Sequence, residues 1–154
     1  MHWNVVLAPA KAVGAFFRRK ARKHYVDKAA LVRDGAEVIT PAIDSATAFG
    51  PANVAIGSQD EIRTRMAPVW DGWHEGRKKL LTYVNSHPSD EIRKAGHDAA
   101  DAVTASSAAT HYLFQMTFAK VQGFNLHDCY QDADKKNAEA IQKMRDLMDE
   151  VRVY

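Results

Sequence analysis

The sequence has little of what disulfide scaffolds, β-sheets and membrane spans require. Its 154 residues include one cysteine, Cys129, which excludes an internal disulfide and fits a reducing compartment. Strand-type alternation of Val, Ile and Thr is nearly absent, and the eight glycines and five prolines gather in a few places. No apolar run approaches the roughly 20 residues that cross a bilayer. These absences predict an all-α, cytoplasmic protein.

Motifs of enzymes and cofactor proteins are also missing. The chain has no Gly-x-Ser-x-Gly elbow and no glycine-rich phosphate loop. Seven histidines are present, but the Glu-x-x-His pairs of di-metal bundles are not. His97 and Asp101 have the four-residue spacing of a chelating pair, and His127 precedes Cys129 by two. Neither pair belongs to a set of three or four ligands, so we predict no catalytic residues, no metal and no cofactor.

Four amphipathic helices are expected from the positions of apolar residues. Their ranges are about 10–49, 59–84, 89–123 and 125–151, with turns at 50–57, 85–88 and 123–126. Ser58 and Glu61 form a capping box before the second helix, and Ser89 and Asn125 can cap the next two. Short turns favour an antiparallel four-helix bundle with a long N-terminal helix, kinked or broken between residues 35 and 41. Pro68 should kink the second helix or mark a later start.

Helix 89–123 is expected to be central. Its apolar stripe begins with small residues and ends with large ones, from Tyr112 to Phe124. Small residues let a neighbouring helix approach closely, and large ones hold it away. We therefore expect tight packing at one end of this helix and a splayed, aromatic core at the other.

Residues 70–76 are a second unusual stretch. Two glycines within a helix each cost roughly 1 kcal/mol relative to alanine. Close packing against another helix is the favoured explanation of this cost. The alternative is a pocket for a small molecule or a peptide, formed by Trp70, Gly72, Trp73 and Gly76.

Charge is distributed unevenly along the chain. Residues 1–33 hold eight Lys and Arg against one Asp, a net charge of +7, whereas residues 34–154 hold thirteen against eighteen, a net charge of −5. We therefore divide the chain into a basic, amphipathic N-terminal arm (1–33) and a bundle body (34–154). Aromatic and basic side chains of the arm are its candidate binding residues: Trp3, Phe16, Phe17, Arg18, Arg19, Lys20, Arg22 and Lys23.

Several partners fit such an arm. Aromatic residues beside a basic run are typical of helices that lie on an anionic membrane surface. The same charges could hold an acidic protein partner or the acidic body of a second copy, and they could also contact nucleic-acid phosphates. We expect a non-enzymatic interaction or structural protein that docks through its arm onto a protein assembly or a membrane surface. Nucleic-acid binding is the alternative, and a small-ligand or metal-binding bundle comes third.

Overall fold

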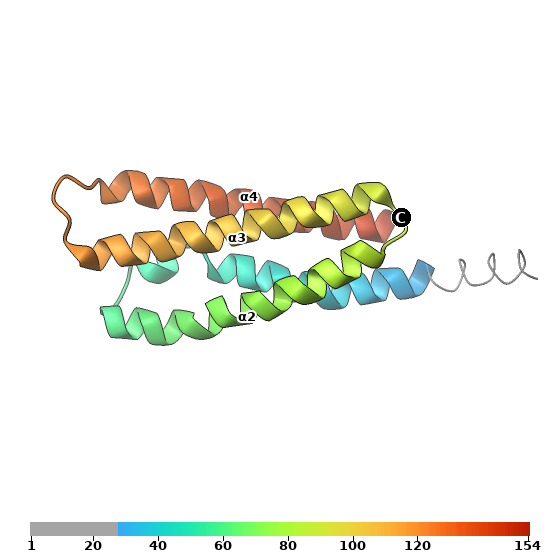
Figure 1. The fold of residues 1–154 in the computed structure, drawn as a ribbon, viewed down its shortest axis with the longest axis horizontal. Coiled ribbons are helices and arrows are strands. Elements are labelled where there is room, and N and C mark those ends of the chain that lie inside the picture. The colour runs from blue at the N-terminus through green and yellow to red at the C-terminus, as the bar shows by residue number, and fades with distance from the viewer. Residues whose placement is uncertain (1–27) are drawn as a thin grey trace, which may run out of the picture.

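A computed structural model describes residues 28–154, and this part of the chain is an up-and-down, antiparallel bundle of four helices (Figure 1). The first helix covers residues 28–48. A short 3-10 helix, η1 (Pro51–Val54), and a loop lead to α2 (Gln59–Ser86), α3 (Asp90–Ala119) and α4 (Leu126–Val153). Within residues 28–154 there is no strand, and no helix is long and apolar enough to cross a membrane. The prediction of an all-α bundle is confirmed.

The three predicted helix caps are confirmed. The Ser58 hydroxyl accepts from the Glu61 N–H at 3.2 Å, and the Glu61 carboxylate accepts from the Ser58 N–H at 3.3 Å. Ser89 and Asn125 each accept, through a side-chain oxygen, the N–H of the third residue that follows. These contacts satisfy backbone donors that a helix start leaves unpaired.

Neither internal proline ends a helix. Residues 28–48 are helical without interruption through Pro41, so a break there is ruled out. The boundary between residues 33 and 34 lies inside the same helix. Helix α2 begins at Gln59 and continues through Pro68, which rules out a later start, the alternative to a kink at this proline. Its ribbon changes direction in its first half (Figure 1), in line with the lost hydrogen bond and the steric clash of an internal proline.

Helix α3 ends earlier than the sequence indicated. Lys120 adopts a left-handed conformation, with φ of 51°, and ends the helix after Ala119. Gly123, the expected stop, lies in the following turn with φ of 76°. Val121 continues the apolar spacing of the stripe, but it lies beyond the end of the helix and is 53% exposed.

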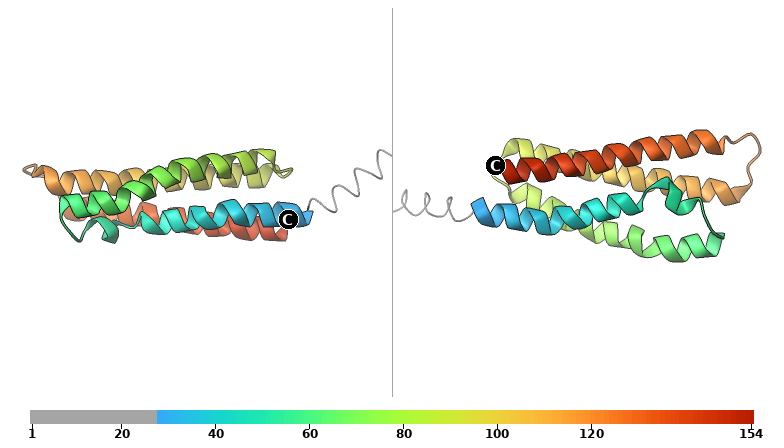
Figure 2. Two further views of the ribbon diagram at one scale, coloured as in Figure 1. Left: turned by 90° about the horizontal axis from the view of Figure 1, so that it is seen from below. Right: turned by 180° about the vertical axis from the view of Figure 1, so that it is seen from behind.

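The core lies along the bundle axis, and α2 and α3 approach each other closely near their shared turn. A Cβ atom on Gly96 of α3 would lie 2.4 Å from Val84 Cγ1 of α2, which leaves no room for any side chain. Toward the other end the two ribbons separate (Figure 1), while the first helix lies beside α4 in both views of Figure 2. The small half of the α3 stripe therefore packs closely, as expected.

A buried polar layer joins three helices at the end of the first one. Thr110 of α3 donates its hydroxyl to the Phe49 carbonyl at 2.6 Å. Asn137 of α4 donates to the Ala46 carbonyl at 2.7 Å and to the Ser106 hydroxyl at 3.1 Å. Thr110 thus satisfies the buried Phe49 carbonyl, and Asn137 adds a second donor to the Ala46 carbonyl, which also accepts the Phe49 N–H at 3.2 Å.

Candidate functional site

Most of the predicted arm lies outside the described residues, and so does every one of its candidate binding residues. These are Trp3, Phe16, Phe17, Arg18, Arg19, Lys20, Arg22 and Lys23. The structure does describe residues 28–33, where the chain enters the bundle.

Residues 28–33 are held against the bundle by two tyrosines. The Tyr83 hydroxyl of α2 donates to the Leu31 carbonyl at 2.6 Å, and the Lys28 ammonium lies 5.6 Å from the centre of the Tyr154 ring. Burial, with the nearby Asp34 carboxylate as a smaller cause, raises the pKa of Tyr83 to about 12. Tyr83 therefore remains a neutral donor, and the chain enters the bundle at the same end as Tyr154.

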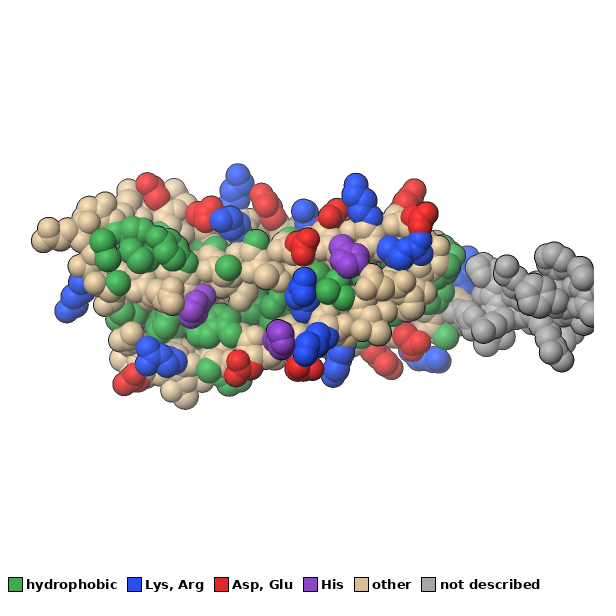
Figure 3. Space-filling model, viewed as in Figure 1, with side chains coloured by type: hydrophobic (Ala, Val, Ile, Leu, Met, Phe, Trp, Pro, Cys, Tyr) green, Lys and Arg blue, Asp and Glu red, His purple; other side chains and the backbone are tan. Residues whose placement is uncertain are grey.

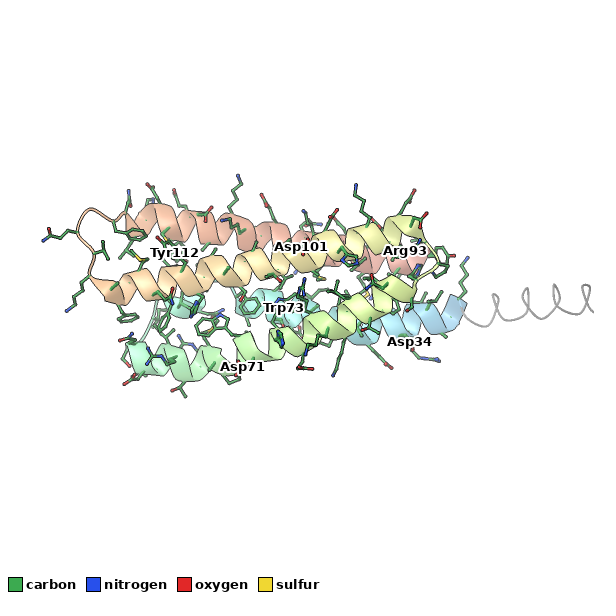
Figure 4. The ribbon with its side chains drawn as sticks, in the orientation of Figure 1. Asp34, Asp71, Trp73, Arg93, Asp101 and Tyr112 are labelled. Atoms are coloured by element: carbon green, nitrogen blue, oxygen red, sulfur yellow. The ribbon has the colours of Figure 1, made fainter. Side chains whose placement is uncertain are left out.

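The four residues predicted to form a pocket do not converge on one site. Trp73 is 5% exposed and points inward from α2, whereas Asp71 points away from the bundle (Figure 4). The Trp73 indole N–H donates to Thr104 Oγ1 at 3.2 Å. A Cβ on Gly72 would meet no atom within 4 Å, and one on Gly76 only the Trp73 ring at 3.8 Å. The expected close packing at both glycines is wrong.

Trp70 does line a hollow, but with residues of α3 instead of its own neighbours. Where α2 and α3 diverge, a surface groove of about 560 Å³ opens between them. Figure 3 shows hydrophobic side chains at the surface between these two helices. The groove is lined by Gln59, Arg63, Ala67, Trp70, His111, Phe114, Gln115, Phe118 and Ala119.

A second hollow of about 310 Å³ continues the first one along α3, because Trp70 and His111 line both. Its other lining residues are Thr104, Ser107 and Ala108. The two hollows together are called the α2/α3 groove below. It runs along the outside of the bundle, away from the shared turn of the two helices.

Aromatic rings form the floor of the α2/α3 groove. Trp70 packs perpendicular to His111, with ring centres 4.7 Å apart, and its ring centre is 6.0 Å from that of Phe114. Phe114 and Phe118 pack edge to face at 5.5 Å. The Trp70 indole N–H is buried without an acceptor among residues 28–154. The surface of the groove is therefore mainly apolar at these rings.

The charge of the α2/α3 groove is positive. Arg63 is the only Lys or Arg that lines it, and no Asp or Glu does. Asp60, one turn before Arg63 on α2, lies 3.6 Å from its guanidinium, but both side chains are more than half exposed. Exposed ion pairs of this kind are weak, so Arg63 is available to an anion.

Of the groove residues, only Trp70 was predicted from the sequence. Arg63 was missed, and so were the ring-bearing residues His111, Phe114 and Phe118. The signal that points to them is the change from small to large residues along α3, which predicted a splayed aromatic end. Which of these aromatic residues face α2 depends on how the two helices are rotated. The sequence does not determine this rotation.

The histidine-containing pairs noted in the sequence do not form a metal site among the described residues. His97 Nε2 lies 2.6 Å from the Asn85 side-chain oxygen, while the Asp101 carboxylate lies 3.9 Å from the Arg77 guanidinium. Across residues 28–154, no three His, Cys, Asp or Glu side chains gather in a way that could hold a metal ion.

Cys129 is half-buried in the first turn of α4. Burial raises the pKa of its thiol; Asp132 raises it further, and Lys136 acts in the opposite direction. A raised pKa lowers the fraction of reactive thiolate.

His87 is the only buried histidine among the described residues. It lies in the turn between α2 and α3, where its Nδ1 accepts from the Ser89 N–H at 3.0 Å. Its ring packs perpendicular to Tyr154, with ring centres 4.7 Å apart. Burial and, secondarily, the Arg93 charge lower the pKa of His87, so the neutral ring is the stable form.

Comparisons of the chain with protein-family models, with curated proteins and with solved structures found no match. Function therefore has to be inferred from the chain's own charges and surfaces.

Proposed function

We propose that the protein is a non-enzymatic interaction module whose basic N-terminal arm docks it onto an anionic membrane surface. The helical bundle is the body that the arm holds there. The observation that carries this proposal is the separation of charge along the chain, together with the aromatic residues beside the basic run.

The net charge of the bundle supports the assignment of surface binding to the arm and not to the bundle. Residues 28–154 hold fifteen Lys and Arg against eighteen Asp and Glu, a net charge of −3, whereas residues 1–27 hold six against one, a net charge of +5. Some cations of the bundle lie beside a carboxylate, as Lys136 does at 2.9 Å from Asp132. An anionic surface attracts nearby Lys and Arg by about 1 kcal/mol each, so residues 1–27 provide the attraction.

Vesicle flotation of the full chain tests the proposal. Wild-type protein should float with vesicles of phosphatidylglycerol and phosphatidylcholine at low salt, and should stay at the bottom with phosphatidylcholine alone. Replacing Arg18, Arg19, Arg22 and Lys23 by Gln should weaken binding by about 4 kcal/mol, which is about a thousandfold. Added salt should weaken wild-type binding as well, because it screens exposed charges.

A matched control separates the arm from net charge. Exposed lysines of the bundle provide it: Lys79, Lys94, Lys135 and Lys143, also replaced by Gln. This variant has the same net charge as the arm variant and should still float. A third variant, with Trp3, Phe16 and Phe17 changed to Ser, should bind less tightly because aromatic side chains insert at the interface.

Two results would contradict the proposal: wild-type protein that does not float on anionic vesicles, or equal losses in the arm variant and the lysine control. Salt-sensitive binding to double-stranded DNA by the wild type, in the first case, would favour the nucleic-acid alternative.

A further inference from the structure

We propose that the α2/α3 groove binds a linear alkyl carboxylate, with the alkyl chain over Trp70, Phe114 and Phe118 and the carboxylate beside Arg63. This inference concerns the bundle alone and does not depend on the proposed membrane docking.

The shape of the groove suits a long, narrow ligand. Its two hollows join at Trp70 and His111 and follow α3 from Thr104 to Ala119. At the helical rise of 1.5 Å per residue this stretch is about 22 Å long. The larger hollow alone, at about 560 Å³, falls within the usual range of ligand sites.

The floor of the groove is apolar where a chain would lie. Ala67, Trp70, Phe114 and Phe118 line its larger hollow, and Ala108 lines the smaller one. Phe114 is almost fully buried at 4% exposure, whereas Trp70 and Phe118 remain partly exposed. An alkyl chain that covers these rings removes apolar surface from water, which is the main favourable term in binding such ligands.

The charge of the groove favours an anionic end group, which would compete for Arg63 with the exposed Asp60 carboxylate at 3.6 Å. Arg63 lies toward the start of α2, with Gln59 and Gln115 as neutral polar neighbours, and the lining includes no carboxylate. A lining free of acids is notable in a bundle with a net charge of −3. A single cation at one end of an apolar groove complements one negative charge at one end of an apolar molecule.

The same charge argues against the chain's own arm as the occupant. Residues 1–33 carry a net charge of +7, and Arg63 would repel them. A carboxylate, by contrast, is attracted to Arg63.

Calorimetric titration of the full-length protein with decanoate, below its micelle concentration and at pH 8, tests this inference. Decanol, which has the same chain without the charge, is the comparison ligand. Ala67→Trp fills the groove, and Arg63→Gln removes its cation. The matched controls are Ala138→Trp and Arg145→Gln, because both positions are exposed on α4 and lie outside the groove.

Decanoate should bind the wild type with a Kd below about 1 mM and should bind the Ala67→Trp variant at least about tenfold more weakly. Arg63→Gln should weaken decanoate by about two- to fivefold, the range of an exposed charge pair, and leave decanol unchanged. Ala138→Trp and Arg145→Gln should behave as the wild type.

The inference is overturned if decanoate does not bind the wild type, or if Ala67→Trp binds it as well as Ala138→Trp does. Equal losses for decanoate and decanol in Arg63→Gln would overturn the assignment of the carboxylate to Arg63. Circular dichroism of each variant establishes that it is folded. Vesicle flotation of Ala67→Trp should equal that of the wild type. The groove proposal and the membrane proposal are therefore tested by separate measurements, and either can fail alone.

Discussion

At the scale of single residues, the effect of replacing a glycine by alanine on stability depends on the atoms around it. Three glycines illustrate this dependence: Gly72, Gly76 and Gly96. Gly72 and Gly76 have space for a Cβ, and alanine favours the helix interior over glycine by about 1 kcal/mol. We expect Gly72→Ala and Gly76→Ala each to raise the free energy of unfolding by up to about 1 kcal/mol. Urea denaturation measures this change.

Gly96→Ala should have the opposite sign. Its Cβ would lie 2.4 Å from Val84 Cγ1, and forcing an extra carbon into a packed contact typically costs about 1–3 kcal/mol. A stabilised Gly96→Ala variant would mean that α2 and α3 do not approach as closely as the structure indicates.

His87 should make the bundle less stable in mild acid. Its pKa is lowered in the folded protein, so below the ordinary value of about 6.5 the unfolded chain takes up a proton first. The free energy of unfolding should therefore fall as the pH drops below about 6.5, and level off once folded His87 is also protonated. Above that pH, this residue contributes no pH dependence.

His87→Asn isolates this contribution. Asparagine can accept the Ser89 N–H through its side-chain oxygen but does not titrate. Urea denaturation at several pH values should show a shallower loss of stability below about pH 6.5 in the variant than in the wild type. Equal slopes in the two proteins would show that His87 titrates normally.

At the scale of the elements, the end of the first helix depends on side chains from α3 and α4. Thr110→Val keeps the shape of the side chain and leaves the buried Phe49 carbonyl without its 2.6 Å hydrogen bond. An unsatisfied buried group costs about 1–3 kcal/mol, and thermal or urea unfolding should show that loss. Thr117→Val is the control, since Thr117 is exposed and donates to Leu113 of its own helix; a similar loss there would contradict the expectation.

Helix starts were predictable because their chemistry is local. Ser58, Ser89 and Asn125 each bond a backbone group three residues away, so the sequence alone indicates them. The end of α3 was missed because Lys120 adopts a left-handed conformation, which is unusual for a residue other than glycine or asparagine. The role of Asn137 was also missed, since its partner Ala46 is 91 residues away in the chain.

At the scale of the whole molecule, the candidate site was only partly predictable. Trp70 was selected from its sequence neighbours, but the groove that it lines is completed by His111 and Phe114. Their facing positions follow from the divergence of α2 and α3, which starts from the tight contact at Gly96. Which residues of α2 and α3 face each other therefore depends on tertiary packing, and the sequence alone does not determine it. The separation of charge along the chain, by contrast, is a property of composition and needs no structure.

The α2/α3 groove and the point where residues 1–27 join the bundle lie toward opposite ends of the bundle. Lys28 and Tyr154 lie together at one end, while the α2/α3 groove reaches Ala119 at the other. The 30 residues of α3 correspond to about 45 Å of helix. If its long axis stood perpendicular to the bilayer, a bundle attached through residues 1–27 would be a rigid spacer that carries its groove away from the lipid. It would collect a ligand from the surrounding solution, with no need to extract one from the membrane.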